Sequence, residues 1–226
     1  MTYSSWQVNY FMLIRALMLT LVSALLLSAC ASKSKLPSTL SEAEQARASL
    51  VETARSQFSQ AVDLINQDEA SSEDLDAAKE ILLSVNKANP EYLGPIMNLG
   101  IIAVKQDHLT EAKGYFQQVV DLNASKNTAQ KNQRLRLASL NYLGVVAREE
   151  GRFDEAEEYY REVLVADANN KAALRNLAIL LDLYRGQLIE ALALYEQYQG
   201  LLEAPDAKLK DWIFDINSRI KARGSE

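Results

Sequence analysis

The chain of 226 residues is 48% hydrophobic and 24% charged, which suits one or two globular domains and excludes a disordered or collagen-like chain. A formal net charge of -6 argues against nonspecific nucleic-acid binding, because such binding depends on clustered Lys and Arg. A single cysteine excludes an intrachain disulfide, and one Cys with one His cannot alone supply a tetrahedral zinc site. We therefore expect neither a nucleic-acid partner nor a metal.

The first part of the chain contains a hydrophobic segment, residues 11–29, whose only polar residues are Arg15, a threonine and serines. Its core is a run of about twelve residues, whereas a helix that spans a bilayer needs about 20. The shorter length fits the apolar region of a signal peptide, with Arg15 as the preceding positive charge. We predict a cleaved signal peptide over residues 1–29, and an uncleaved membrane anchor is the alternative. Met12 offers a second possible start of translation.

Cys30 follows three apolar or small residues, Leu27, Ser28 and Ala29. This arrangement resembles the bacterial lipobox. The resemblance implies that the chain is cut before Cys30, that diacylglycerol is attached to the thiol, and that the new amino group is acylated. Several acyl chains anchor a protein firmly because each buried methylene contributes about 0.8 kcal/mol. Ala31 and Ser32 stand where an Asp favours the inner membrane, so the resemblance implies the outer membrane, facing the periplasm.

The segment 30–40 joins this cysteine to a helical region. Its residues after Cys30 are small and polar and include Pro37, which predicts a flexible linker. Ser41 and Glu44 form a capping-box pattern, which predicts that an N-terminal helix over 41–58 begins there. Apolar residues then recur at three- and four-residue intervals, and no stretch shows sustained period-two alternation. We predict an all-α fold.

A small residue is followed four positions later by a large one at four places: Ala78 and Leu82, Ala112 and Phe116, Ala156 and Tyr160, Ala191 and Tyr195. The first two alanines are 34 residues apart, as are Gly144 and Ala178. Upstream stand Leu99-Gly100, Leu143-Gly144 and Leu177-Ala178, with gaps of 12, 12 and 13 residues to the matching alanine. Such a period indicates a solenoid of stacked helical hairpins.

These motifs resemble the tetratricopeptide repeat, which pairs a Leu-Gly in its first helix with an Ala and a following aromatic in its second. The resemblance implies an all-α solenoid of about four helical hairpins over residues 59–205, between an N-terminal helix and a C-terminal capping helix. The expected repeats are 59–92, 93–126, 137–170 and 171–205, and the capping helix is 206–226.

Close packing of paired helices requires small residues on both faces, so we expect Gly100 to lie opposite Ala112 and Gly144 opposite Ala156. Gly151 ends a first helix, where a positive φ is expected. The additional residue of the last repeat is expected in its turn, around 185–186.

About ten extra residues, 127–136, stand between the second and third repeats and predict a lengthened first helix. They contain a local group of basic residues, Lys131, Arg134 and Arg136. Two interpretations are open: a solvated extension of the helix, or a surface that docks to an acidic partner or to lipid head groups.

The sequence contains no HExxH, GxSxG or Walker motif. His108 is the sole histidine and stands in a predicted turn, where an exposed residue is expected rather than a general base. We therefore expect no enzyme, no catalytic residue, no small-molecule substrate and no cofactor other than the lipid on Cys30.

The tetratricopeptide resemblance implies that the first helices of the hairpins line a concave groove that binds an extended peptide or a partner helix. Asn suits such a groove because its amide pairs with a peptide backbone, and Arg148 and Arg175 could pair with a carboxylate. The predicted groove residues are Met97, Asn98, Ile101, Lys105, Asn141, Val145, Arg148, Arg175, Asn176, Ile179 and Asp182.

Lipoproteins of this build resemble the pilotins of type IV pili and the tetratricopeptide lipoproteins of tight-adherence pili. The resemblance implies a scaffold that binds proteins during assembly of a pilus or secretion machine. Two alternatives remain: an adaptor for a periplasmic protease or peptidoglycan hydrolase, and an accessory to a TonB-type energy-transducing complex.

Overall fold

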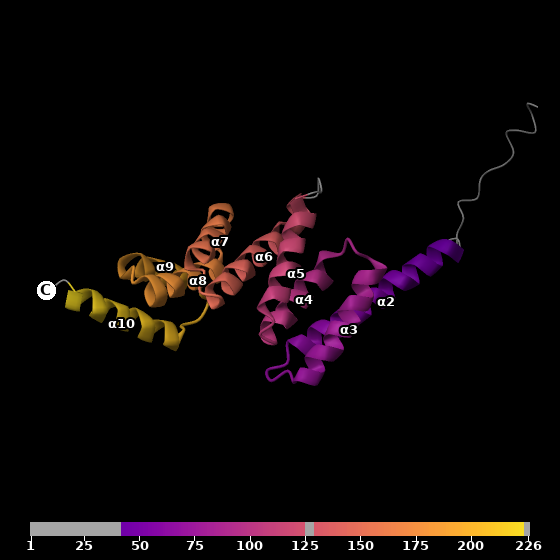
Figure 1. Ribbon diagram of the computed structural model, residues 1–226, viewed down its shortest axis with the longest axis horizontal. Helices are drawn as coiled ribbons and strands as arrows, with labels where there is room; N and C mark the ends of the chain where they lie inside the picture. The colour runs from indigo at the N-terminus through magenta and orange to yellow at the C-terminus, as the bar shows by residue number, and fades with distance from the viewer. Residues whose placement is uncertain (1–41, 125–128, 224–226) are drawn as a thin grey trace, which may run out of the picture. The chain divides into compact units, whose positions relative to one another are not determined.

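The computed structural model describes residues 42–124 and 129–223 (Figure 1). The chain divides into two units between Leu50 and Val51. In the first unit the described residues, 42–50, are helical, and 44–50 are exposed. The predicted signal peptide, Cys30, the linker and Ser41 of the predicted capping box lie outside the described residues.

The described residues are helical and contain no strand, which confirms the predicted all-α class. The elements are α2 (Glu42–Ile65), α3 (Ser72–Ala88), α4 (Leu93–Lys105), α5 (Leu109–Ala124), α6 (Ala129–Glu149), α7 (Phe153–Ala166), α8 (Lys171–Ile179), η1 (Leu180–Arg185), α9 (Leu188–Gly200) and α10 (Ala207–Arg223). Helix α2 runs without interruption through the predicted boundary at 58/59. None of the helices in the described ranges is long and apolar enough to cross a membrane.

Successive helices pack as hairpins, α4 with α5, α6 with α7, and α8 with α9, and each hairpin contacts the next. Gly151 has a φ of 76° in the turn between α6 and α7, as predicted. The first turn of α3 is closed by a capping box, in which the Ser71 side chain and Asp74 satisfy each other's backbone N–H groups. Local turn and capping residues therefore begin and end the helices where the repeat period requires.

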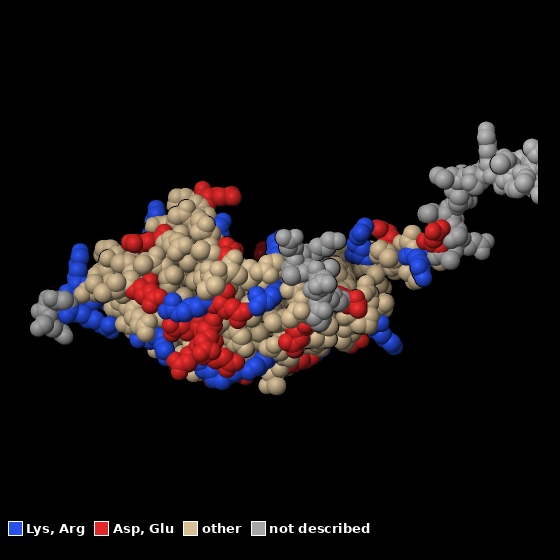
Figure 2. Space-filling view, turned by 90° about the horizontal axis from the view of Figure 1, so that it is seen from above, with Lys and Arg blue, Asp and Glu red and all other residues tan. Residues whose placement is uncertain are grey.

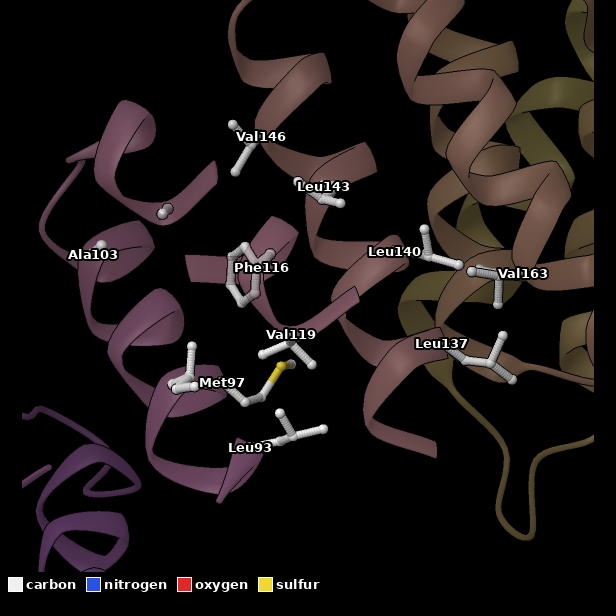
Figure 3. Packing of buried hydrophobic residues seen from close by; sticks show 13 residues of the cluster. Leu93, Met97, Ala103, Phe116, Val119, Leu137, Leu140, Leu143, Val146 and Val163 are labelled. Atoms are coloured by element: carbon white, nitrogen blue, oxygen red, sulfur yellow. The ribbon is translucent and has the colours of Figure 1, made fainter. Parts of the chain in front are cut away.

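The core lies between the hairpins and is built around the large residue that follows each alanine. Phe116, Tyr160 and Tyr195 are at most 1% exposed. Figure 3 shows Phe116 of α5 at the centre of one cluster, between Met97 of α4 and Leu143 of α6. Because one ring contacts helices of two neighbouring hairpins, burial of these rings holds the repeats together.

The glycines of the Leu-Gly pairs lie against these rings. A Cβ built on Gly100 would be 2.6 Å from Phe116, and one built on Gly144 would be 2.5 Å from Tyr160. The nearest atoms belong to the aromatic residue rather than to Ala112 or Ala156, so the closest partner differs from the expected one. The ring is longer than the alanine and reaches the facing helix first, which leaves no room for a side chain.

The additional residue of the fourth repeat lies in a helix and not in the predicted turn. Leu180–Arg185 forms a π-helix that continues α8 and ends at Gly186, whose φ is 66°. A π-helical turn accommodates an inserted residue without ending the helix. The prediction that the additional residue lies in the turn at 185–186 was therefore wrong, although Gly186 does form that turn.

Charged side chains link the second helices of neighbouring hairpins, and Figure 2 shows acidic and basic side chains next to one another on one face. Three bridges join α3 to α5, α5 to α7 and α7 to α9: Lys79 with Glu111 at 2.9 Å, Lys113 with Glu155 at 3.3 Å, and Arg161 with Glu190 at 2.8 Å. Such partly exposed pairs each contribute about 0–1 kcal/mol, so they support the register rather than create it.

Candidate partner-binding site

The predicted groove residues lie on α4, α6, α8 and η1, the first helices of three successive hairpins. Helix α4 contacts α6, and α6 contacts α8. The side chains differ widely in exposure. Lys105 and Arg175 are exposed; Asn98, Ile101, Val145, Arg148, Asn176 and Ile179 are partly buried; Met97, Asn141 and Asp182 are buried.

Three apolar groove residues share one place in the repeat, directly after the small residue of the first helix. They are Ile101, Val145 and Ile179, and each is partly buried. Each packs on a buried cluster with part of its surface and leaves the rest accessible. An apolar side chain at the same step of each repeat can contact side chains of an extended or helical partner.

The asparagines of the site have partners within the protein. The Nδ2 of Asn176 donates to Oδ1 of Asn141 at 3.0 Å, which links α8 to α6. The Nδ2 of Asn98 donates to the carbonyl of Gly94 at 2.9 Å within α4. These amides therefore contribute to the arrangement of the first helices, and a peptide backbone would compete with bonds already made.

Met97 belongs to the interior. Its sulfur accepts a hydrogen bond from the hydroxyl of Ser139 at 3.1 Å, and both residues are buried. This contact ties α4 to α6. Met97 therefore supports the site from within and does not present its side chain to solvent.

Helix α10 packs against the hairpin of the fourth repeat, α8 with α9. Arg175 lies over the ring of Trp212 at 5.8 Å, and Asp182 forms an ion pair with Arg219. Burial raises the pKa of Tyr195, and the nearby Asp182 carboxylate raises it further. Asp182 was predicted to face a partner, but only 7% of its side chain is exposed. Helix α10 covers Asp182 and supplies Arg219, the cation that a buried carboxylate needs.

Arg148 is a further charged residue of the groove, and its side chain is 15% exposed. Its Nη2 donates to Oε1 of Glu149 at 2.7 Å. Burial acts to lower the pKa of Arg148, but the bond to Glu149 and the nearby groups of Glu149, Tyr160 and Tyr184 together outweigh it, so the pKa lies above its ordinary value. Arg148 is therefore a charged donor held at the edge of the core.

Sequence reasoning did not include Tyr160 and Tyr184 among the site residues. Tyr160 is fully buried, and burial raises its pKa well above the usual value; Arg148, Glu149 and Tyr184 interact with it electrostatically. Tyr184 is 47% exposed and packs on Phe153 at 4.8 Å. Arg148 is four residues after Gly144, and this spacing would have placed it beside the Tyr160 ring. The spacing could not have predicted where the Tyr160 hydroxyl points.

The basic group of the insertion is only partly described. Helix α6 has 21 residues against 13 in α4, so the insertion does lengthen a first helix. Arg134 is exposed, Arg136 pairs with Glu162 of α7, and the side chain of Lys131 lies outside the described residues. The pair with Glu162 neutralises one of the cations that a docking surface would use.

The described ranges hold no cluster of three or more His, Cys, Asp or Glu that could bind a metal. The His108 side chain is 58% exposed in the turn before α5, with its Nδ1 3.7 Å from Glu111. A cavity of about 710 Å³ lies between the start of α9 and the end of α10, lined by Leu188, Ile189, Ala193 and Ile220 among others. None of the predicted groove residues lines it.

The fold and this surface define a class, that of helical-hairpin repeat proteins that act as scaffolds for protein interactions. A family model of the tetratricopeptide repeat matches residues 97–171 and 143–208. The chain therefore carries tetratricopeptide repeats, and its fold is a tetratricopeptide-repeat solenoid, as the sequence predicts. A search of curated proteins gave no match.

Several solved structures have a similar fold. The pilF protein of Pseudomonas aeruginosa is 17% identical, with a TM-score of 0.59 over 80% of this chain and 78% of that one. A MamA structure from Desulfovibrio magneticus RS-1, which begins at residue 41 of MamA, is 14% identical, with a TM-score of 0.58 over 77% of this chain and 89% of that one. A tetratricopeptide repeat protein of Parabacteroides merdae is 18% identical, with a TM-score of 0.53 over 76% and 61%. At such identities the similarity concerns the fold alone.

Proposed function

We propose that the chain is a lipid-anchored scaffold of the outer membrane, facing the periplasm, that binds protein partners during assembly of a pilus or secretion machine. The observation that carries the binding role is the repeated surface of α4, α6 and α8, in which Ile101, Val145 and Ile179 recur at one place in each hairpin. Repetition of this kind suits a partner that runs along several hairpins.

The proposed anchor rests on the resemblance of Leu27 to Cys30 to a lipobox. Acyl groups on Cys30 would hold the protein at the membrane, and the linker to residue 40 would let the repeats stand away from the lipid. The pilus role rests on the resemblance to pilotins described above, and the similar fold of the Pseudomonas aeruginosa pilF protein supports it. Proteins with this fold are generally non-catalytic scaffolds, and we propose the same here, without a cofactor other than the lipid.

A site-specific photo-crosslinker tests the binding surface. Lys105 lies on α4 and is exposed, whereas Val165 lies on the second helix α7 and is 89% exposed. With the crosslinker at Lys105, we expect capture of a secretin or pilus component from cells, identified by mass spectrometry. The same group at Val165 is the matched control and should capture none of it. Equal capture from both positions would exclude the first helices as the binding surface.

The same experiment separates the proposed machine from other partners. Capture at Lys105 of a periplasmic protease, a peptidoglycan hydrolase or a TonB-type component, with no pilus or secretion component, would replace the proposed role while keeping the scaffold. The anchor is tested separately by Cys30→Ser. We expect this variant to leave the membrane in a high-salt wash, and continued membrane binding would contradict lipidation of Cys30.

A further inference from the structure

Two polar groups of the third repeat's hairpin, α6 with α7, are buried and have no hydrogen-bond partner among the described residues. They are the hydroxyl of Tyr160 on α7 and the Nε of Arg148 on α6. The Tyr160 ring lies against Gly144, and Arg148 follows Gly144 by one helical turn. Residues four apart share one face of a helix, so Arg148 lies on the face of α6 that meets the Tyr160 ring, and its charge acts on the Tyr160 hydroxyl. Native proteins leave few such groups unpaired, and each requires an explanation.

The hairpin of the fourth repeat, α8 with α9, shows the same place with a carboxylate in it. Tyr195 takes the place of Tyr160, and Asp182 takes the place of Arg148, four residues after the small residue of the first helix. The carboxylate of Asp182 pairs with the guanidinium of Arg219 from α10, and its charge acts on the Tyr195 hydroxyl. Within this protein, a carboxylate therefore fits between a buried tyrosine hydroxyl and a guanidinium.

The third hairpin has the tyrosine and the guanidinium but lacks that carboxylate. Glu149 accepts from Nη2 of Arg148 at 2.7 Å and leaves Nε without an acceptor. Glu149 and Tyr184 also act electrostatically on the Tyr160 hydroxyl, but neither forms a hydrogen bond with it. An Arg donates only, and a carboxylate is the strongest acceptor for such a charged donor.

We propose that a carboxylate of the protein partner enters this place and accepts from Arg148 Nε and the Tyr160 hydroxyl. The site rests on the proposed scaffold function and specifies the chemistry that the partner brings to the junction of the third and fourth hairpins. Both donor atoms are buried, whereas the Arg148 side chain is 15% exposed and Tyr184 is 47% exposed, so the site lies beneath accessible side chains that must move to admit a carboxylate. The carboxylate can come from an Asp or Glu side chain or from a chain terminus.

Matched peptides test the proposal with the full chain in detergent. An array carries short peptides in pairs that differ only by Glu against Gln, Asp against Asn, or a C-terminal acid against its amide. The best-binding pairs are then titrated in solution by fluorescence anisotropy. We expect the acid member to bind about tenfold tighter or more, which corresponds to about 1.4 kcal/mol. The pair that shows the difference identifies the source, a side chain or a terminus.

Two variants assign the preference to the site. Tyr160→Phe removes only the hydroxyl, and Arg148→Met removes the guanidinium at similar length; each should abolish most of the acid preference. Tyr195→Phe is the matched control, because it removes the equivalent hydroxyl where Asp182 already fills the place, and it should keep the preference. Tyr160→Phe should melt no lower than the wild-type protein, whereas Tyr195→Phe should melt lower because it removes the hydroxyl that interacts with the Asp182 carboxylate.

Equal binding of acid and amide members, or an acid preference that survives both Arg148→Met and Tyr160→Phe, would overturn the proposed carboxylate site. In those cases peptide binding itself persists, and the scaffold function stands. If no peptide on the array binds, the groove function fails together with the carboxylate site.

Discussion

Replacing Gly144 by Ala tests whether the glycine-ring contact sets the distance between paired helices. A Cβ at this position would lie 2.5, 2.8 and 2.9 Å from Cε1, Cδ1 and Cζ of Tyr160. Carbon atoms that are not bonded prefer a separation of about 3.5–4.0 Å. The Tyr160 ring is rigid and fully buried, so it cannot swing away, and α6 and α7 must separate by roughly 1 Å to relieve the clash.

The expected free-energy change is the balance of two effects. Ala is better than Gly within a helix by about 1 kcal/mol. Overpacking of a filled core costs about 1–3 kcal/mol, and three ring atoms within 2.9 Å place this case at the upper end. We therefore expect Gly144→Ala to lower the free energy of unfolding by about 2 kcal/mol.

Urea and thermal unfolding, followed by circular dichroism, measure this change. A loss of about 2 kcal/mol corresponds to a decrease in Tm of roughly 4–8 °C for a domain of this size. Gly114→Ala on α5 is the control, because a Cβ there meets nothing within 4 Å and should raise stability. If Gly144→Ala is as stable as the wild-type protein or more stable, the close contact does not constrain the hairpin and the reasoning is refuted.

Two further predictions concern charged groups. Arg219→Met leaves the Asp182 carboxylate, 7% exposed, without its cation and should lower the free energy of unfolding by about 2 kcal/mol, less than for a fully buried pair because Arg219 is 38% exposed. Urea denaturation measures the loss, which should shrink when Asp182→Asn is combined with it, and an unchanged midpoint would show that α10 does not depend on the pair. The hydrogen bond from Lys79 lowers the pKa of Glu111 from its ordinary 4.5 and raises that of Lys79 from 10.5. The stabilisation, under about 1 kcal/mol, is therefore present above pH 4.5, is lost as pH falls through the folded pKa of Glu111, and is lost again as pH rises through that of Lys79. Lys79→Met should be less stable than wild type at neutral pH and equal to it in acid; a stability difference that persists at pH 2 would exclude the ion pair as its cause.

The repeat period was the most informative signal in the sequence, because every hairpin must bury the same face against its neighbours. Ala112 and Ala156, with their following aromatics, are buried as the period requires. Gly151 takes the positive φ expected of it. These predictions depend on local conformation and on residue spacing, both of which a single sequence contains.

The inserted residue of the fourth repeat shows where spacing becomes ambiguous. A gap of 13 instead of 12 residues reveals that one residue is added, but a longer turn and a π-helical turn satisfy the same count. The choice of Leu180–Arg185 depends on packing, because the π-turn keeps Leu180 and Leu181 buried. No local preference in the sequence distinguishes these alternatives.

The sequence predicted which helices carry the candidate site residues, but it did not predict which of their side chains are exposed. The period places Asn141, Arg148 and Asp182 on first helices, where the structure also has them. It could not predict that Asn176 bonds to Asn141, or that α10 covers Asp182 with Arg219. Each of these contacts joins residues at least 35 positions apart, and a helical period describes only one helix at a time.

The sequence by itself determined the helical class, the hairpin period, the turns at glycine and the choice of aromatic residues for the core, because these follow from periodicity and backbone preference. Only the tertiary structure decided which polar groups are satisfied. Asp182 is paired with Arg219, whereas Arg148 Nε and the Tyr160 hydroxyl lack an acceptor among the described residues. Hydrogen-bond satisfaction depends on the positions of side chains from several helices, so it arises only when the hairpins are stacked.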